Sequence, residues 1–180
     1  MNRRLFNLLF AGLFIAFGGL LLPGRADAAT KEEAIKAGEE LLEKNLNELN
    51  ALFKKQADDR GQNLYMVAWE YQNSSARIFI RVKHLGTKGG KDVISYSAWT
   101  QVAQAPQGET LPPAVIKLIC TETDTNMLGN FSLNEKMDMA FANMTGVVNG
   151  MTPEGLWISL TAQTLNVNDI KKKIEAAQRG

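Results

Sequence analysis

Apolar residues recur with the period of an α-helix in the segment that follows residue 29. Ile35, Leu42 and Leu49 lie seven positions apart and belong to an apolar stripe that extends over about seven turns. Thr30 begins a capping-box motif, with a glutamate three residues later, which marks the start of a helix. We therefore predict one long amphipathic helix that continues as far as the turn residues at 58–61.

Three segments then alternate with the period of a β-strand. Leu64–Tyr71 is apolar on both faces, which predicts a strand covered on two sides, whereas Arg77–Lys83 and Val93–Val102 each have one polar face. Turn-forming residues separate the segments, so we predict an antiparallel three-stranded meander. Two aromatic residues, Phe79 and Trp99, interrupt the polar faces of the second and third strands.

A second helix and two more strands are predicted further along the chain. Pro112-Pro113 suits the first turn of a short helix, which continues through apolar residues to Cys120. Met127–Leu133 and Lys136–Met144 then alternate as two strands. These strands would join the same antiparallel sheet.

The last helix has a sharply defined start. Thr152 is a hydroxyl N-cap, and Pro153 occupies the first helical position, where its missing amide donor costs nothing. Glu154 adds negative charge near the positive end of the helix dipole, and apolar residues recur as far as Ile174. The order helix, three strands, helix, two strands, helix predicts an α+β fold with helices packed on an antiparallel sheet.

The first 28 residues have the features of an export signal. Arg3 and Arg4 precede an apolar run, Leu5–Leu22, and an A-x-A cleavage pattern ends at Ala28. We expect cleavage near Ala28, a single mature domain of residues 29–180 and a periplasmic or secreted location. The run of 18 residues is just long enough to span a bilayer, so an uncleaved anchor is the alternative, with membrane contact through this segment alone.

The charge of the chain is close to neutral. The full sequence has a net charge of +1 at pH 7, and removal of the signal takes away three arginines and one aspartate, which leaves −1. Nucleic-acid binding requires a basic surface, and the side chains of the basic run Lys171-Lys172-Lys173 point in different directions on a helix. We expect no nucleic-acid partner.

Residues suited to catalysis or metal binding are scarce. Cys120 and His84 are the only cysteine and the only histidine, which would allow a single nucleophilic pair. Cys120 continues the apolar positions of its helix, however, so we expect a buried, inert thiol. His84 has no second histidine or cysteine with which to hold a metal, and we expect a surface or hydrogen-bonded side chain. The glycine-rich segment 86–92 departs from a phosphate loop in spacing and predicts a strand connection, so we expect no enzyme and no cofactor.

Methionine and aromatic residues provide the best candidates for a binding surface. Met137, Met139, Met144 and Met151 lie within fifteen residues of one another. Flexible thioethers adapt to irregular partners, although they also fill gaps in a core. Aromatic side chains on strand faces that otherwise meet water often mark an interface. The residues that we expect to contact a partner are Phe79, Trp99, Met137, Met139 and Phe141.

Two segments give the sequence a resemblance to a known family. Leu128-Gly-Asn-Phe-Ser-Leu133 and Gly150-Met-Thr-Pro-Glu154, within residues from about 30 to 176, resemble the YbjN-like family, which shares the fold of type III secretion chaperones. The resemblance implies the order α-β-β-β-α-β-β-α around a twisted antiparallel sheet. It also implies a non-enzymatic protein, and the secretion chaperones form dimers that hold partner segments in extended form.

The sequence therefore predicts an exported domain that binds another polypeptide and acts as a chaperone or a regulator. We expect it to be a homodimer without a cofactor. The alternative is a periplasmic carrier that encloses a small apolar ligand between helix and sheet.

Overall fold

A computed structural model of the protein describes residues 30–125 and 129–179. The predicted export signal, residues 1–28, lies outside the described residues, as does the start of the strand predicted at Met127. The chain divides into two units, residues 1–30 and residues 31–180, and the domain described below is the second. Within the described residues, no helix has both the length and the hydropathy needed to cross a membrane.

The domain is an α+β fold with helices packed on one antiparallel sheet, as predicted. Within the described residues it has three helices and six strands, one strand more than the sequence suggested. In chain order the elements are α2 (Lys31–Glu48), β1 (Leu52–Ala57), β2 (Asn63–Tyr71), β3 (Ser74–Lys88), β4 (Lys91–Gln104), α3 (Pro113–Thr125), β5 (Asn130–Leu133), β6 (Met139–Val147) and α4 (Pro153–Arg179). The strands lie in the order β1-β2-β3-β4-β6-β5, so the first four form a meander and β6 joins β4 to the edge strand β5.

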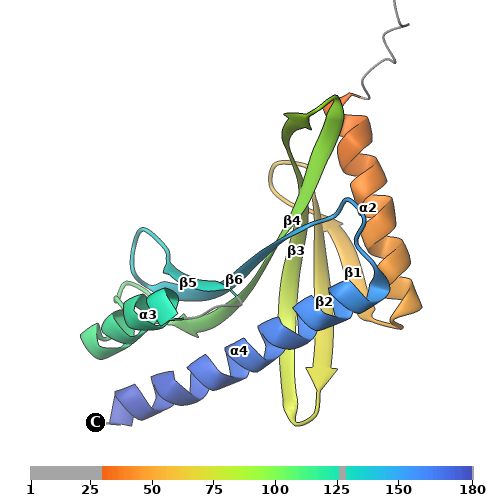
Figure 1. Ribbon diagram of the computed structural model, residues 1–180. Coiled ribbons are helices and arrows are strands. Elements are labelled where there is room, and N and C mark those ends of the chain that lie inside the picture. The colour runs from red at the N-terminus through yellow and green to blue at the C-terminus, as the bar shows by residue number, and fades with distance from the viewer. Residues whose placement is uncertain (1–29, 126–128, 180) are drawn as a thin grey trace, which may run out of the picture. The chain divides into compact units, whose positions relative to one another are not determined.

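Helices α2 and α4 pack against one face of the sheet, which we call the inner face. Figure 1 shows α4 crossing the strands and α2 lying beside the meander. The inner-face residues of β2, β3 and β4 alternate with those of the opposite, outer face, so that Val67, Ile78 and Ile80 are fully buried against the helices. Leu42 on α2 and Leu160 on α4 complete this core.

The first helix ends earlier than the sequence suggested, and an extra strand follows it. Asn50 adopts a left-handed backbone conformation, with φ of 52°. The Asn50 N–H donates to the Asn47 carbonyl (3.0 Å), and the Ala51 N–H donates to the Leu46 carbonyl (2.9 Å), which is the bonding of a Schellman cap. The prediction of one helix up to residue 57 is therefore wrong, because the cap stops α2 at Glu48 and frees Leu52–Ala57 to pair with β2.

The predicted starts of the other two helices are confirmed. The N–H of Gly155 donates to Thr152 Oγ1 (3.1 Å), so Thr152 is the N-cap of α4 and Pro153 its first residue. Helix α3 begins at Pro113. The prediction that Cys120 is buried is wrong, because α3 turns Val115 and Ile119 into the core and leaves Cys120 exposed.

Candidate functional site

The outer face of the sheet carries the aromatic residues that the sequence singled out. Phe79 on β3 and Trp99 on β4 are paired directly across the two strands, and their rings stack with centroids 6.0 Å apart and an interplanar angle of 24°. Met66 lies opposite Phe79 on β2. These three side chains are only partly buried, and they form an apolar row that crosses the sheet. We call Met66, Phe79 and Trp99 the aromatic row.

An arginine extends the aromatic row toward one end of the sheet. The Arg81 guanidinium lies 5.6 Å from the centre of the Trp99 ring, in reach of a cation–π contact. Asp58, in the loop before β2, forms an ion pair with Arg81. The N–H groups of Gln62 and Arg60 each donate to Asp58 Oδ1 (2.9 Å). The pKa of Asp58 is lowered most by the hydrogen bond from the Gln62 N–H, and further by the bond from Arg60 and the charge of Arg81. The carboxylate that holds Arg81 therefore stays ionised.

The structure places the remaining candidates on or near the same face. Phe141 and Met139 lie on β6 with their side chains partly buried, and Phe141 pairs with Gln101 beside the aromatic row. Met137 lies instead in the turn before β6, with φ of 54° and 48% of its surface exposed. Four of the five predicted residues therefore share the outer face, and Met137 stands at its margin. Their part in partner binding stays a prediction.

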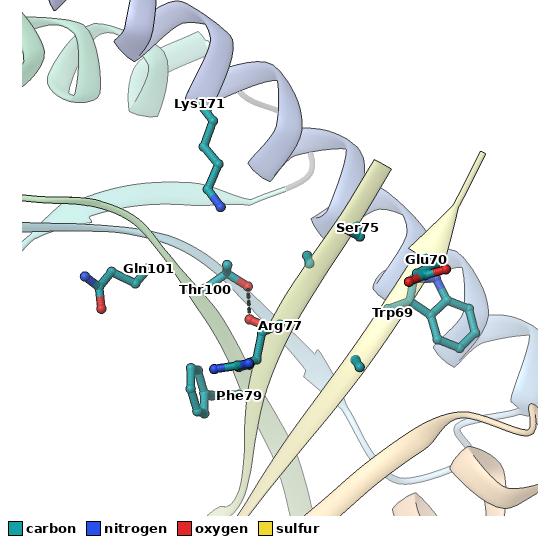
Figure 2. Close-up of a pocket in the computed structure, with 10 residues that line it drawn as sticks. Trp69, Glu70, Ser75, Arg77, Phe79, Thr100, Gln101 and Lys171 are labelled. Atoms are coloured by element: carbon teal, nitrogen blue, oxygen red, sulfur yellow. Dashed lines mark hydrogen bonds between the residues drawn. The ribbon is translucent and has the colours of Figure 1, made fainter. Parts of the chain in front are cut away.

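The sheet splits beside the aromatic row. The ladder between β3 and β4 runs from Lys88 and Lys91 to Phe79 and Trp99, and beyond that point β3 pairs only with β2 and β4 only with β6. A cavity of about 550 Å³ occupies the split, which Figure 2 shows between the two strands.

Backbone groups of β3 line one side of the split. Thr100 Oγ1 donates to the Arg77 carbonyl (3.0 Å), so the backbone groups of Arg77 point toward β4. Because alternate residues of a strand direct their N–H and C=O groups to the same side, Ser75 also presents its backbone to the split. The ladders give these positions no neighbouring strand on that side. The sequence pattern could not show this unpaired part of β3. Alternation of apolar and polar residues shows which face of the sheet a side chain lies on, but not where two paired strands separate.

Two cations flank the split. Arg77 lies on the outer face of β3, and Figure 2 shows Lys171 reaching from α4 toward the split. Neither side chain forms an ion pair among the described residues. Glu70 also lines the cavity, which leaves an excess of one positive charge.

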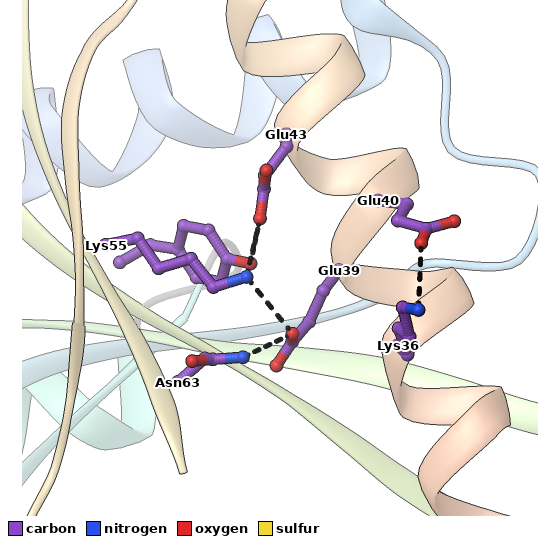
Figure 3. A network of polar contacts seen from close by, with 7 residues as sticks. Lys36, Glu39, Glu40, Glu43, Lys55 and Asn63 are labelled. Carbon is purple, nitrogen blue, oxygen red and sulfur yellow. Dashed lines mark hydrogen bonds and ion pairs between the residues drawn. The ribbon is translucent and has the colours of Figure 1, made fainter.

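A polar network fastens α2 to the inner side of the sheet (Figure 3). Tyr65 Oη donates to Glu43 Oε1 (2.6 Å), and Lys55 Nζ lies 2.9 Å from the same oxygen. Lys55 Nζ also lies 3.5 Å from Glu39, whose carboxylate accepts a hydrogen bond of 2.6 Å from Asn63 Nδ2. The hydrogen bond from Tyr65 lowers the pKa of Glu43 most, and the bond from Lys55 lowers it further. Burial and the hydrogen bond to Glu43 raise the pKa of Tyr65.

The groups considered for catalysis do not meet. His84 Nε2 lies 2.7 Å from Asp92 Oδ1 near the turn of the β3–β4 hairpin, so the prediction of a hydrogen-bonded histidine is confirmed. Cys120 lies on α3, which packs against β5 and α4 at the other end of the sheet in Figure 1. The glycine-rich segment is the turn of the β3–β4 hairpin, as predicted, and the side chain of Asp92 accepts hydrogen bonds there. No cluster of three metal-ligating side chains occurs within residues 30–125 and 129–179.

Comparison with known proteins gives similarity in structure alone. No family model matches the chain, and no curated protein sequence matches it. The type III secretion chaperone SycH of Yersinia pestis, solved in complex with a fragment of YscM2, is 13% identical over 74% of this chain and 98% of that chain, with a TM-score of 0.41. The chaperone–effector complex of SchA and HopA1 matches with 10% identity over 74% of this chain and 92% of that chain, with a TM-score of 0.43. At this level the similarity concerns the arrangement of elements and assigns neither a family nor a partner.

Proposed function

We propose that the domain binds a segment of another polypeptide on the outer face of the sheet, without catalysing a reaction. The observation that carries this proposal is the stacked pair Phe79–Trp99, which lies half-buried on the face opposite to the helices. Rigid aromatic side chains supply much of the binding energy at protein interfaces, because they bury a large area with few rotatable bonds. An aromatic pair on a strand face without a covering helix is therefore suited to a partner.

The split between β3 and β4 would add directional contacts to this apolar surface. A segment in extended conformation can pair its backbone with the groups of Ser75, in the way that a strand joins a sheet edge, and with the Arg77 carbonyl if it displaces the Thr100 hydroxyl. Its side chains would alternate between the aromatic row and the interior of the split. Acidic side chains of the segment would then meet Arg77 and Lys171.

Two further parts of the proposal concern the state of the protein. We propose that the mature chain is exported, on the basis of the signal-like residues 1–28, and that it acts as a homodimer. The carrier of a small apolar ligand is less well supported, because the largest cavity described, about 750 Å³ beside α2, is lined mainly by charged side chains.

Native mass spectrometry of the mature chain, purified from its own compartment, tests the proposal. We expect a second polypeptide to remain bound to the native chain. The substitution Phe79→Ser or Trp99→Ser should lower the affinity for the partner about thirtyfold or more, because truncation of an aromatic hot spot costs about 2 kcal/mol or more. Both side chains are partly exposed, so the melting temperature of each variant serves as the check on folding.

A matched control comes from helix α4. Ile158 is 60% exposed and lies outside the outer face, so Ile158→Ser removes a comparable exposed apolar side chain. This variant should keep full binding. Equal loss in all three variants, or a lipid-sized adduct in place of a polypeptide, would contradict the proposal. A mass of twice the mature chain would support the homodimer, and a strictly monomeric mass would overturn it.

A further inference from the structure

A cleft near the start of α2 carries an excess of positive charge. It has a volume of about 750 Å³ and lies between the first turns of α2, the loop residues 60–62 and β3. Clefts of about 300–1,000 Å³ hold small organic ligands. The charged side chains that line the cleft are the basic Lys31, Lys36, Lys55, Arg60, Arg81 and Lys83 and the acidic Glu32 and Glu39.

Half of the basic side chains already have partners. Glu39, the acidic residue on the inner wall, is compensated by Lys55 and by the hydrogen bond from Asn63, as Figure 3 shows. The existing ion pairs of the cleft cations are Lys36 with Glu40, Lys55 with Glu39 and Glu43, and Arg81 with Asp58. These pairs join three cations to four carboxylates and so contribute a net charge of −1, which the remaining charges of the cleft outweigh.

The remaining charges are positive. Lys31, Arg60 and Lys83 form no ion pair among the described residues, and all three side chains are exposed. Glu32 is the one acidic lining residue that remains outside the pairs described above. The N-terminus of α2, an 18-residue helix, adds the positive end of its dipole at Lys31. Three cations from three separate segments therefore surround a cleft that holds one uncompensated carboxylate.

We propose that this cleft binds a phosphate-bearing anion, with Lys31, Arg60 and Lys83 as its ligands. A phosphate group carries a charge of about −1.5 to −2 near pH 7 and presents three strong acceptor oxygens. A planar guanidinium such as that of Arg60 can engage two of these oxygens, while lysines supply point charges. A ligand with one such group is opposite in sign to the unpaired cations Lys31, Arg60 and Lys83.

The phosphate could belong to a soluble compound or to a lipid headgroup, and two probes distinguish these sources. Sodium pyrophosphate is titrated into the mature chain and followed through the amide signals of the cleft in nuclear magnetic resonance spectra. Separately, the chain is floated with vesicles of phosphatidylglycerol and, as a neutral comparison, of phosphatidylcholine. Shifts with pyrophosphate indicate a soluble ligand, and selective flotation with phosphatidylglycerol alone indicates a headgroup. Either result supports the proposal if substitution of the cleft residues weakens the binding.

Variants that remove one positive charge inside or outside the cleft show whether binding depends on the cleft. Arg60→Gln and Lys83→Gln should each weaken binding about tenfold or more, because each removes a charge-assisted hydrogen bond. Lys172→Gln makes the same change of charge on the exposed side of α4 and should leave binding within twofold, about the scatter of such a measurement. Binding of neither probe at millimolar concentration, or an equal loss in Lys172→Gln, would overturn the proposal. The outcome is independent of partner binding at Phe79 and Trp99.

Discussion

Gly38 shows how closely a single position governs the packing of α2. A β-carbon added at Gly38 would lie 2.6 Å from Ile94 Cγ2 and 3.1 Å from Val82 Cγ1, so the helix can approach β3 and β4 only because this residue has no side chain. Glycine in a helix interior costs about 1 kcal/mol relative to alanine, and the sequence alone therefore gives no reason to retain it. The close approach supplies the reason.

The exchange Gly38→Ala should lower the free energy of unfolding. Overpacking costs about 1–3 kcal/mol, which outweighs the gain in helix propensity of about 1 kcal/mol. Gly155→Ala is the matched control in α4, since the nearest atom to its added β-carbon is Thr152 Oγ1 at 3.5 Å. Urea unfolding should show Gly38→Ala as less stable and Gly155→Ala as equal to or more stable than the native chain. The reverse order would contradict the packing described for α2.

Residues with a strong local signal could be predicted from the sequence, and residues defined by their neighbours could not. Thr152 and Pro153 mark the start of α4 through short-range chemistry. Asn50 also had a local signal, because asparagine tolerates the left-handed conformation of a helix cap, but the apolar period continues past it through Leu52 and Phe53 and hides it. Cys120 fits both an exposed and a buried position on an apolar helix, and only the direction in which α3 packs decides between them.

At the scale of elements, α2 is held to the sheet by both apolar and polar contacts. Leu42 and Leu46 are fully buried, while Glu43 and Glu39 reach β1 and β2 through Lys55, Tyr65 and Asn63. The sequence pattern predicted Lys55 on the same long helix as Glu39 and Glu43. The network formed because α2 stops at Glu48 and the chain returns as β1, which brings Lys55 back beside Glu43.

This network predicts a dependence of stability on pH. The hydrogen bond that Glu43 accepts from Tyr65, followed in size by its bond with Lys55, lowers the folded-state pKa of Glu43 below the ordinary value of 4.5. Folding therefore favours the ionised carboxylate, and the stabilisation is complete above the unfolded-state pKa and is lost as the pH falls through the folded-state pKa. The exchange Glu43→Gln should flatten the decline in melting temperature between about pH 5 and about pH 3.

The control for this prediction lies on the same helix. Glu40 is exposed and its only ion pair described is with Lys36 at 4.0 Å, so Glu40→Gln should keep the pH profile of the native chain. Part of the decline will persist in Glu43→Gln, because Asp58 and Asp92 also have lowered pKa values. Parallel profiles for Glu43→Gln and the native chain would show that the network contributes nothing to stability in acid.

At the scale of the whole domain, the class of fold followed from the order of periodic segments. Helices and strands alternate in the sequence with clear caps and turns, and the antiparallel sheet follows from short connections between the strands. The sequence could also place Phe79 and Trp99 on one face, because each alternates with buried residues. It could not show that β3 and β4 separate beside them, which depends on where their ladder ends, or that Met137 falls in a turn, which depends on how β5 pairs with β6.

The domain therefore has two faces with different properties. The inner face is filled by α2 and α4, and the outer face presents an aromatic row next to a split in the sheet. The cationic cleft at the start of α2 adjoins this face through Arg81. We infer that the outer face, and not the exposed surface of the helices, contacts another polypeptide.

Site-specific photocrosslinking in the cells that produce the protein tests this claim most directly. A photoreactive phenylalanine analogue replaces Ser75 or Gln101, which are exposed on the outer face, or Ile158 and Lys172, which are exposed on α4. Illumination should join the same polypeptide to the chain from Ser75 and Gln101, with little product from the two positions on α4. Crosslinks that form from Ile158 or Lys172 and are missing from the outer face would contradict this claim.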